Sequence, residues 1–320
     1  MRRWLVFFLI LPAPAFAGTI YVTDEQANLI HVVDETRLVE TGRIEVGRRP
    51  RGISPSSDGR LLYVAVGNDD CVEIVDRAAG RVVGKLPSGP DPESIALDAD
   101  GRRLFVANEN DNLMSVLDVA TGRVLAEVPV GVEPEGLALS PDGAVVVNTS
   151  ESTSGVHFID ARTLSLLDTV LVDTRPRAAA FTPDGRTLWV SSEARGTITL
   201  IDVARRAIVS IVDFETMEVP GDASRPIQPV GIRMTRDGSR VFVALGRRGV
   251  VAELDPESLA VRRWFPVGFR AWHLDLSADE SRLYTANGLS GDMSAIDLVD
   301  NRSLGDVKLG GRPWGIVVVP

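Results

Sequence analysis

The sequence predicts an all-β protein, a seven-bladed β-propeller in which every blade is a four-stranded antiparallel sheet. Two observations predict this fold. A unit of 42 residues recurs along the chain after residue 17, and repeats of roughly 40 to 45 residues are typical of helix pairs or of propeller blades. Each unit consists of short β-branched runs, such as "CVEIVD" and "TITLID", separated by turn residues, which favours blades.

The period can be read from an aspartate that opens a turn in each repeat. It occurs at Asp58, Asp100, Asp142, Asp184, Asp237 and Asp279. Every step is 42 residues except one of 53, so the chain holds one insertion of 11 residues, within Asp213–Pro229. This insertion is either a functional loop or a tolerated surface insertion.

Each unit contains four predicted strands. The first strand follows a proline, as in "PEGLALSPDG", and examples of the second, third and fourth strands are "RLFVAN", "NLMSVLD" and "RVLAEVPVG". The chain starts with a second strand, at 19–23, and finishes with a first strand, at 314–319. We therefore expect the last blade to be closed by both termini. A single blade cannot bury both faces of its sheet, whereas seven together bury a continuous core.

The first 17 residues have the pattern of a secretory signal peptide. Arg2 and Arg3 precede an apolar run, Trp4–Leu11, and Ala15-Phe16-Ala17 ends the segment, which predicts cleavage after Ala17. The apolar run is too short to span a membrane, and no later run is long enough. We expect a periplasmic protein in which residues 18–320 form a single propeller.

Charge and edge residues limit the expected partners. The formal net charge is −10, which argues against a nucleic-acid partner because phosphate binding needs clustered Lys and Arg. The outer strand "RVVGKL" carries Arg81 and Lys85, and such charges disfavour edge-to-edge pairing of sheets. We expect a monomer.

The repeats resemble a known family. "IYVTD" at 20–24, "LYVAV", "LFVAN" and "SPDG" at 140–143 are similar to the YVTN family of β-propeller repeat proteins. The chain looks most like the exported seven-repeat subgroup associated with PQQ-dependent alcohol catabolism, which accompanies quinoprotein dehydrogenases and has no established reaction. The resemblance implies a non-catalytic binding or scaffold protein, with a periplasmic quinoprotein dehydrogenase or cytochrome as partner. The tryptophans lack the regular motif of the PQQ-binding propellers, so no cofactor is expected.

Function is expected where the repeats disagree, because packing does not dictate those residues. The residue after the proline column lies at the mouth of the central channel and varies around the ring. It reads Arg51, Glu93, Glu135, Arg177, Val230, Trp272 and Trp314. With His273, these residues other than Val230 form the predicted site for a ligand or partner.

Three interpretations of this mouth stay open. The charged residues could be a solvated rim whose Arg and Glu neutralise one another. They could dock a positively charged partner, together with the acidic residues of nearby loops, Asp69, Asp70, Asp91, Asp111 and Glu133. Glu93 and Glu135 could instead hold a metal, for which Ca²⁺ is the suitable ion. Trp272 and Trp314 either pack against neighbouring loops or contact a ligand.

The sequence shows no set of catalytic residues. His31 and His157 share one register but belong to different blades, so they cannot bind one metal together. His273 is the one histidine near the mouth and the one candidate acid or base. The alternative function is therefore a metal-assisted, lactonase-type hydrolase that uses Glu93 and Glu135.

Overall fold

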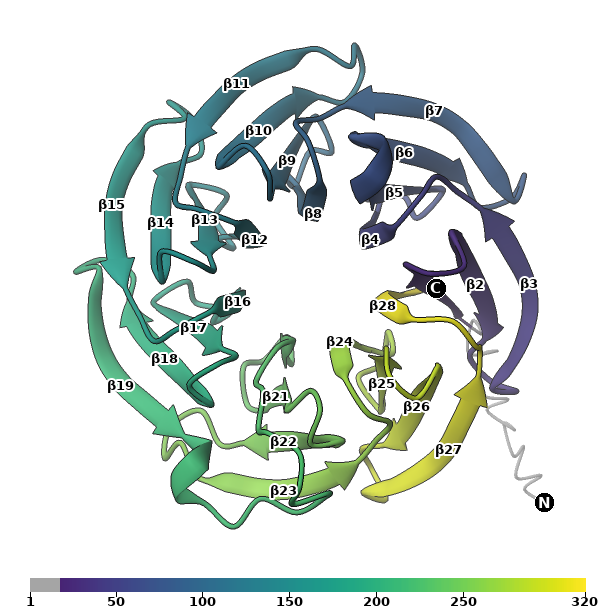
Figure 1. Ribbon diagram of the computed structural model, residues 1–320, viewed down its shortest axis with the longest axis vertical. Helices are drawn as coiled ribbons and strands as arrows, with labels where there is room; N and C mark the ends of the chain where they lie inside the picture. Colours follow the sequence, from purple (N-terminus) through teal and green to yellow (C-terminus); the bar gives the residue numbers. More distant parts are fainter. Residues whose placement is uncertain (1–17) are drawn as a thin grey trace, which may run out of the picture.

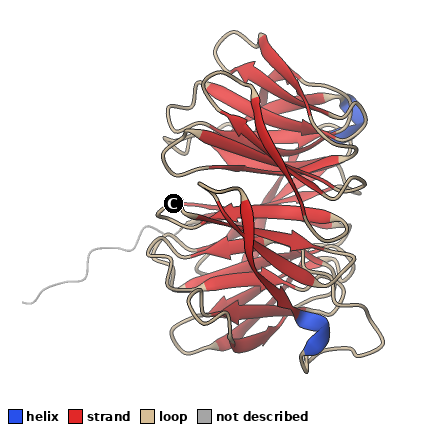
Figure 2. Cartoon of the chain, turned by 90° about the vertical axis from the view of Figure 1, so that its left-hand side faces the viewer, coloured by secondary structure: helices blue, strands red, loops and turns tan. Residues whose placement is uncertain are grey.

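Seven four-stranded antiparallel sheets surround a central axis in the computed structural model, which describes residues 18–320 (Figure 1). Seen from the side, the ring is a slab of strands with loops on both faces (Figure 2). The predicted fold class, a seven-bladed propeller, is confirmed. The predicted signal peptide, residues 1–17, lies outside the described residues. Within the described part, no helix is long and apolar enough to cross a membrane.

Four blades precede the insertion, if the blades are numbered from the first complete one. Blade 1 is β4 (Pro50–Pro55), β5 (Leu61–Val66), β6 (Cys71–Asp76) and β7 (Arg81–Pro87). Blade 2 is β8 (Pro92–Leu97), β9 (Arg103–Asn108), β10 (Leu113–Asp118) and β11 (Val124–Pro129). Blade 3 is β12 (Pro134–Leu139), β13 (Val145–Ser150), β14 (Gly155–Asp160) and β15 (Leu166–Leu171). Blade 4 is β16 (Pro176–Phe181), β17 (Thr187–Ser192), β18 (Thr197–Asp202) and β19 (Ala207–Asp213).

Two further blades and the closing blade complete the ring. Blade 5 is β20 (Ile232–Met234), β21 (Val241–Ala244), β22 (Val250–Leu254) and β23 (Val261–Pro266). Blade 6 is β24 (Ala271–Leu276), β25 (Arg282–Asn287), β26 (Asp292–Asp297) and β27 (Arg302–Lys308). Blade 7 is β28 (Pro313–Val319), β1 (Thr19–Asp24), β2 (Leu29–Asp34) and β3 (Val39–Glu45). The short 3₁₀ segments are η1 (Gly67–Asp69) and η2 (Phe214–Thr216).

Both ends of the chain build blade 7, as predicted. β28 pairs antiparallel with β1, and the register joins Thr19 to Val319 and Tyr21 to Val317. The ring is therefore closed by backbone hydrogen bonds between the first and last strands of the described chain.

The hydrophobic core lies between neighbouring blades. One cluster, for example, joins Val147 and Phe158 of blade 3 to Leu188 and Val190 of blade 4. All four side chains are essentially inaccessible to solvent, and each such burial stabilises the fold by about 1.5 to 3 kcal/mol. Because each blade packs on two neighbours, the core runs around the ring.

The repeated Asp-Gly turns have a structural role on the face opposite the channel mouth. In blade 3, Ser140 donates to Asp142 at 2.6 Å and the Ala144 N–H donates to the same carboxylate at 3.0 Å. These hydrogen bonds hold the pKa of Asp142 below its usual range. Gly143 has a φ of +69°, which favours glycine. We call this side of the ring the turn face.

The innermost strands share a β-bulge just after their first residue. In β12, Pro134 pairs with Ser150 and Leu137 pairs with Asn148, so Glu135 and Gly136 together face one residue, Thr149. The same register shift occurs in the innermost strand of six blades. Bulges change the direction of side chains and are common beside functional sites. Here they govern the direction of the residue after each proline.

At several of these positions the second residue is a glycine, because the next blade comes close. A Cβ on Gly52 would lie 2.6 Å from the Glu93 carbonyl oxygen, and one on Gly231 would lie 2.6 Å from that of Trp272. A Cβ on Gly136 would collide with the Arg177 carbonyl oxygen. This column reads Gly52, Ser94, Gly136, Ala178, Gly231, His273 and Gly315.

The insertion is fastened to the ring. Asp213 caps η2, while Phe214, Val219 and Ile227 are buried. The Arg248 guanidinium donates to four carbonyl groups of the insertion at 2.6 to 3.2 Å, those of Val219, Pro220, Asp222 and Arg225. These contacts fit the interpretation of the insertion as a tolerated addition packed on blade 5.

We predict that Gly136→Ala destabilises the fold by about 1 to 3 kcal/mol, because the new methyl group forces blades 3 and 4 apart. Gly42→Ala is the matched control, since its Cβ would have no atom closer than 3.9 Å. Urea unfolding followed by tryptophan fluorescence measures both. Equal stability of the two variants would contradict the close approach of the bulges.

Candidate functional site

Charged side chains form a buried layer across the channel at the mouth end of the innermost strands. We call it the ion-pair layer. It consists of Arg49, Arg51, Asp91, Glu93, Glu109, Glu135, Glu151, Arg175, Arg177, Glu193 and Arg270. Its residues come from three places in the repeat: before the proline column, after it, and directly after the second strand of a blade.

Arg177 occupies the centre of one half of this layer. It lies 2.6 Å from Glu135 and 2.6 Å from Glu193, and it also contacts Glu151. Arg270 bonds the same Glu193 at 2.7 Å. The carboxylates are nearly inaccessible to solvent, so the guanidiniums provide the compensation that buried charges require.

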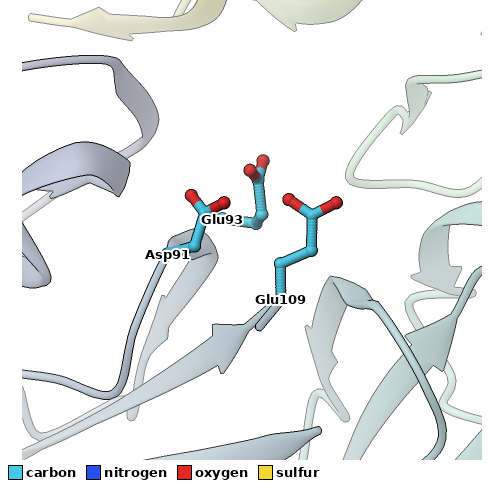
Figure 3. Close-up of side chains that lie close together, drawn as sticks. All are labelled: Asp91, Glu93 and Glu109. Carbon is cyan, nitrogen blue, oxygen red and sulfur yellow. The ribbon is translucent and has the colours of Figure 1, made fainter. Parts of the chain in front are cut away.

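Arg49 occupies the centre of the other half. Asp91 lies in the loop before β8, Glu93 lies in β8, and Glu109 directly follows β9. Their carboxyl groups converge (Figure 3). One oxygen from each lies within 4.8 Å of the others. The Arg49 guanidinium lies 2.7 Å from Glu93 and 3.4 Å from Glu109, and it contacts Asp91. A side chain of the protein therefore supplies the positive charge that this cluster attracts.

The two predicted tryptophans pack against the arginines of the layer. Trp272 and Trp314 lie with ring centroids 6.1 Å apart. Arg270 and Arg177 lie 3.8 and 5.3 Å from the Trp272 ring centroid, and Arg51 lies 5.1 Å from that of Trp314. The indoles thus make cation–π contacts with cations of the chain itself, which fits the packing interpretation of this pair.

His273 is the one large residue in the column of small bulge residues. Its Nδ1 lies 3.2 Å from the Trp314 carbonyl oxygen, so Nδ1 carries the proton and donates it. Burial lowers the pKa of His273 to about 4. The ring is therefore neutral at pH 7, and Nε2 remains a hydrogen-bond acceptor. Its ring also packs on Trp314, at a centroid distance of 4.1 Å.

Two carboxyl groups of the layer hold protons more tightly than ordinary glutamates. Burial, with the neighbouring charge of Glu135, raises the pKa of Glu151 to about 7 despite the contact with Arg177. Burial raises the pKa of Glu93 well above its usual range, against the opposing charge of Arg51. In Glu193 the balance differs: burial opposes ionisation, but Arg177 and Arg270 lower its pKa overall.

A cavity of about 610 Å³ lies in the channel beneath the layer. Its lining starts at Glu135, Arg177, Trp272 and Trp314 and reaches Ser57 and Gly101 on the turn face. The outer members of the layer, including Arg49, Asp91 and Arg270, do not line it. The cavity thus runs along the channel from the inner members of the layer toward the turn face.

The predicted site residues differ in whether they line the cavity. Five of them line it: Glu135, Arg177, Trp272, His273 and Trp314. Arg51 and Glu93 belong to the ion-pair layer without lining the cavity, and Arg51 lies 3.4 Å from Glu93 and 3.3 Å from Glu25. Glu93 and Glu135 each pair with arginines, and whether they also bind a metal stays a prediction.

Sequence reasoning missed the arginines directly before the proline column, although it named Asp91 and Glu133 of the same column as acidic loop residues. Arg49, Arg175 and Arg270 take part in the layer, as does Asp91. Their φ values of +56 to +60° are left-handed, as is that of Glu133. Non-glycine residues in this region carry strain and are enriched at functional sites. The sequence did contain a signal for these residues. A charged residue recurs directly before the proline column, at a turn position whose left-handed backbone would favour glycine.

The acidic loop residues are engaged locally. Asp69 accepts hydrogen bonds from the backbone and side chain of Arg48, both at 2.7 Å. Asp70 accepts from the Asp91 N–H at 3.0 Å, and Asp111 accepts from the Leu113 N–H at 3.1 Å. Docking of a positively charged partner on these residues stays a prediction.

Comparison with known proteins shows the fold. No protein-family model matches the chain, and no curated protein does. It is similar to hydrazine synthase of Kuenenia stuttgartiensis, with a TM-score of 0.78 and 19% identity over 92% of this chain and 99% of that chain. A structure described as a "putative 6-phosphogluconolactonase" of Bacteroides fragilis has a TM-score of 0.78 and 15% identity, over 97% of this chain and 100% of that one. At these identities the likeness shows a shared propeller fold.

We predict that Glu151→Gln reduces the pH dependence of stability between about pH 5 and pH 7.5. The folded-state pKa of about 7 exceeds the ordinary value of 4.5, so the folded chain binds more protons and the wild type loses stability as the pH rises through this window. The loss is on the order of 2 kcal/mol. Thermal unfolding across this range measures it, with Glu45→Gln on exposed β3 as control. A slope in Glu151→Gln equal to that of the wild type would contradict the assignment.

Proposed function

We propose that the chain is a non-catalytic exported binding protein that recognises a ligand or partner at its central channel. One observation carries this proposal. Five residues that break the repeat pattern line one cavity of about 610 Å³, a volume suited to a small molecule. The strands that hold them are fixed by the close contacts between neighbouring bulges, so the walls of the cavity are rigid.

The chemistry of the cavity favours a small polar ligand without strong net charge. Glu135 and Arg177 neutralise each other where the ion-pair layer meets the cavity. Arg233 pairs with Asp275 at 2.6 Å along the wall of the cavity. The faces of both indoles already contact arginines. The neutral His273 offers Nε2 as an acceptor for a hydroxyl or amide group of the ligand.

We predict that His273→Phe weakens ligand binding while the chain stays folded, because phenylalanine keeps a flat ring on Trp314 and removes both ring nitrogens. A thermal-shift screen with uncharged polar metabolites identifies ligands, and calorimetry then compares the variants. The expected loss of affinity is about tenfold or more, as for a buried acceptor. His157→Phe in β14, outside the cavity, is the control. A ligand that binds both variants as well as it binds the wild type would contradict a site in the channel.

The repeat resemblance supports a finer proposal. The chain is periplasmic, acts beside PQQ-dependent alcohol dehydrogenases, and has a quinoprotein dehydrogenase or a cytochrome as its partner. The exposed mouth loops are the surface for that partner. Affinity capture from a periplasmic extract, with the salt dependence of any complex, tests this proposal, because docking on acidic loops weakens as ionic strength rises.

The cluster of Asp91, Glu93 and Glu109 favours a second candidate, a metal-assisted lactonase-type hydrolase. Three carboxylates within 4.8 Å of one another are a suitable set of Ca²⁺ ligands. Arg49 lies among them, so a cation has to compete with a guanidinium. The binding protein is the better supported function for that reason.

We predict that Arg49→Ala creates Ca²⁺ binding that the wild type lacks, with a Kd of about 10⁻⁴ to 10⁻³ M. Titration calorimetry measures it, and Arg48→Ala, which frees exposed Asp69, is the control. Stoichiometric Ca²⁺ bound by the wild type and lost in a Glu93→Gln, Glu135→Gln double variant would instead support the hydrolase. Lactones would then be the substrates to assay.

A further inference from the structure

The first described residue, Gly18, meets a carboxylate at the closing blade. The Gly18 N–H donates to Glu35 Oε2 at 2.9 Å, and the Glu35 N–H donates to the Gly18 carbonyl oxygen at 3.2 Å. These bonds extend the pairing of β1 and β2 by one residue beyond Thr19 and Asp34. The nitrogen of Gly18 is thus held against a negative charge.

Glu35 connects blade 7 to blade 6. Its Oε1 accepts from the Tyr284 hydroxyl at 3.1 Å, and its backbone carbonyl accepts from the Arg282 guanidinium at 3.0 Å. Both partners lie on β25. On the other side, the Val318 N–H of β28 donates to Asp275 of blade 6 at 2.8 Å. Glu35 therefore lies at the seam between the closing blade and its neighbour.

Position 18 lies close against the carboxylate. Gly18 is buried, and a Cβ there would require the end of the Glu35 side chain to move, while it would make an ordinary contact with Val318 Cγ1 at 3.5 Å. The absence of a side chain at Gly18 thus lets the backbone nitrogen and the Glu35 carboxylate meet without such a shift.

The sequence places a processing site at this nitrogen. Ala15-Phe16-Ala17 precedes Gly18 and has the small-residue pattern that signal peptidases cleave. Hydrolysis of the Ala17–Gly18 bond consumes one water and leaves a carboxylate on Ala17 and an ammonium on Gly18. The single amide donor becomes a cation with three donors.

We propose that Glu35 is a binding site for the α-ammonium of the processed chain, so that removal of the signal peptide strengthens the closure of the ring. Before cleavage, Glu35 accepts a hydrogen bond from a neutral amide. After cleavage it faces a charge at the same place, and charge-assisted hydrogen bonds are roughly twice as strong as neutral ones. This inference rests on the predicted cleavage after Ala17 and is independent of the proposed channel ligand.

A double-mutant cycle tests the charge separately from the hydrogen bond. The processed chain, which starts at Gly18, is compared with a chain that carries one extra Ala before Gly18, each with and without Glu35→Gln. The extra residue restores the amide at Gly18 and moves the charge away. We expect Glu35→Gln to lower Tm by about 2 °C more in the processed chain than in the extended one. Glu45→Gln on exposed β3 is the control for loss of a surface carboxylate.

A second measurement uses the reactivity of the terminal amine, and needs no unfolding transition. The ordinary pKa of an α-amino group is about 8, and pairing with Glu35 raises it. Labelling by an amine-reactive ester near pH 8, followed by mass spectrometry, should therefore be roughly tenfold slower in the wild type than in Glu35→Gln. Tyr284 and Arg282 are unchanged in both chains, so they do not account for a difference.

Three results would overturn the proposal. The exported chain could have a mass that does not correspond to a start at Gly18. Glu35→Gln could cost the same stability in the processed and extended chains, which indicates a purely structural carboxylate. The amine could be labelled equally fast with and without Glu35.

Discussion

The ring depends on how closely the innermost strands approach one another at their bulges. Each bulge places a carbonyl oxygen against the second bulge residue of the preceding blade, and Gly52, Gly136, Gly231 and Gly315 leave no space for a Cβ. In three blades a hydroxyl group of the second strand joins the two neighbouring blades at this point by hydrogen bonds. Thr149, for example, accepts from the Gly136 N–H at 2.9 Å and donates to the Arg177 carbonyl oxygen at 2.8 Å. This contact fixes the distance between blades, and so the width of the channel and the direction of the side chains at its end.

Buried charge at the channel follows from the same geometry. The bulges direct acids and bases from neighbouring blades into one layer, in which several of the carboxylates are almost inaccessible to solvent. Glu93 is fully inaccessible and Trp314 is 1% exposed, so only mutual pairing makes the charges tolerable. The acids of the layer include groups with raised pKa, such as Glu151 and Glu93. The layer thus combines closely packed ion pairs with acids whose pKa is raised, at one end of the cavity for which we propose a neutral polar ligand.

The fold was predictable from the sequence because each blade repeats the same turn and strand signals, and the single longer step located the insertion. The residues after the proline column were predictable as a set for a related reason: they break a pattern that packing otherwise maintains. The individual pairs were not. Arg177 pairs with Glu151 and Glu193, which follow the second strands of two blades. Spacing placed acids and bases on one face, but it did not reveal the bulge that decides which acid meets which base. Spacing also did not reveal that arginines would lie over the indole rings. Arg270 reaches the Trp272 ring from the turn before β24, where Arg270 itself has a left-handed backbone conformation.

The pairing of β28 with β1 has a consequence for the order of assembly. β28 follows every other described strand in the chain and is therefore synthesised after them, yet β1 cannot complete its sheet without it. Until β28 has been made, the inner edge of β1 has no partner. During that time this edge is a place where the chain could pair with other chains.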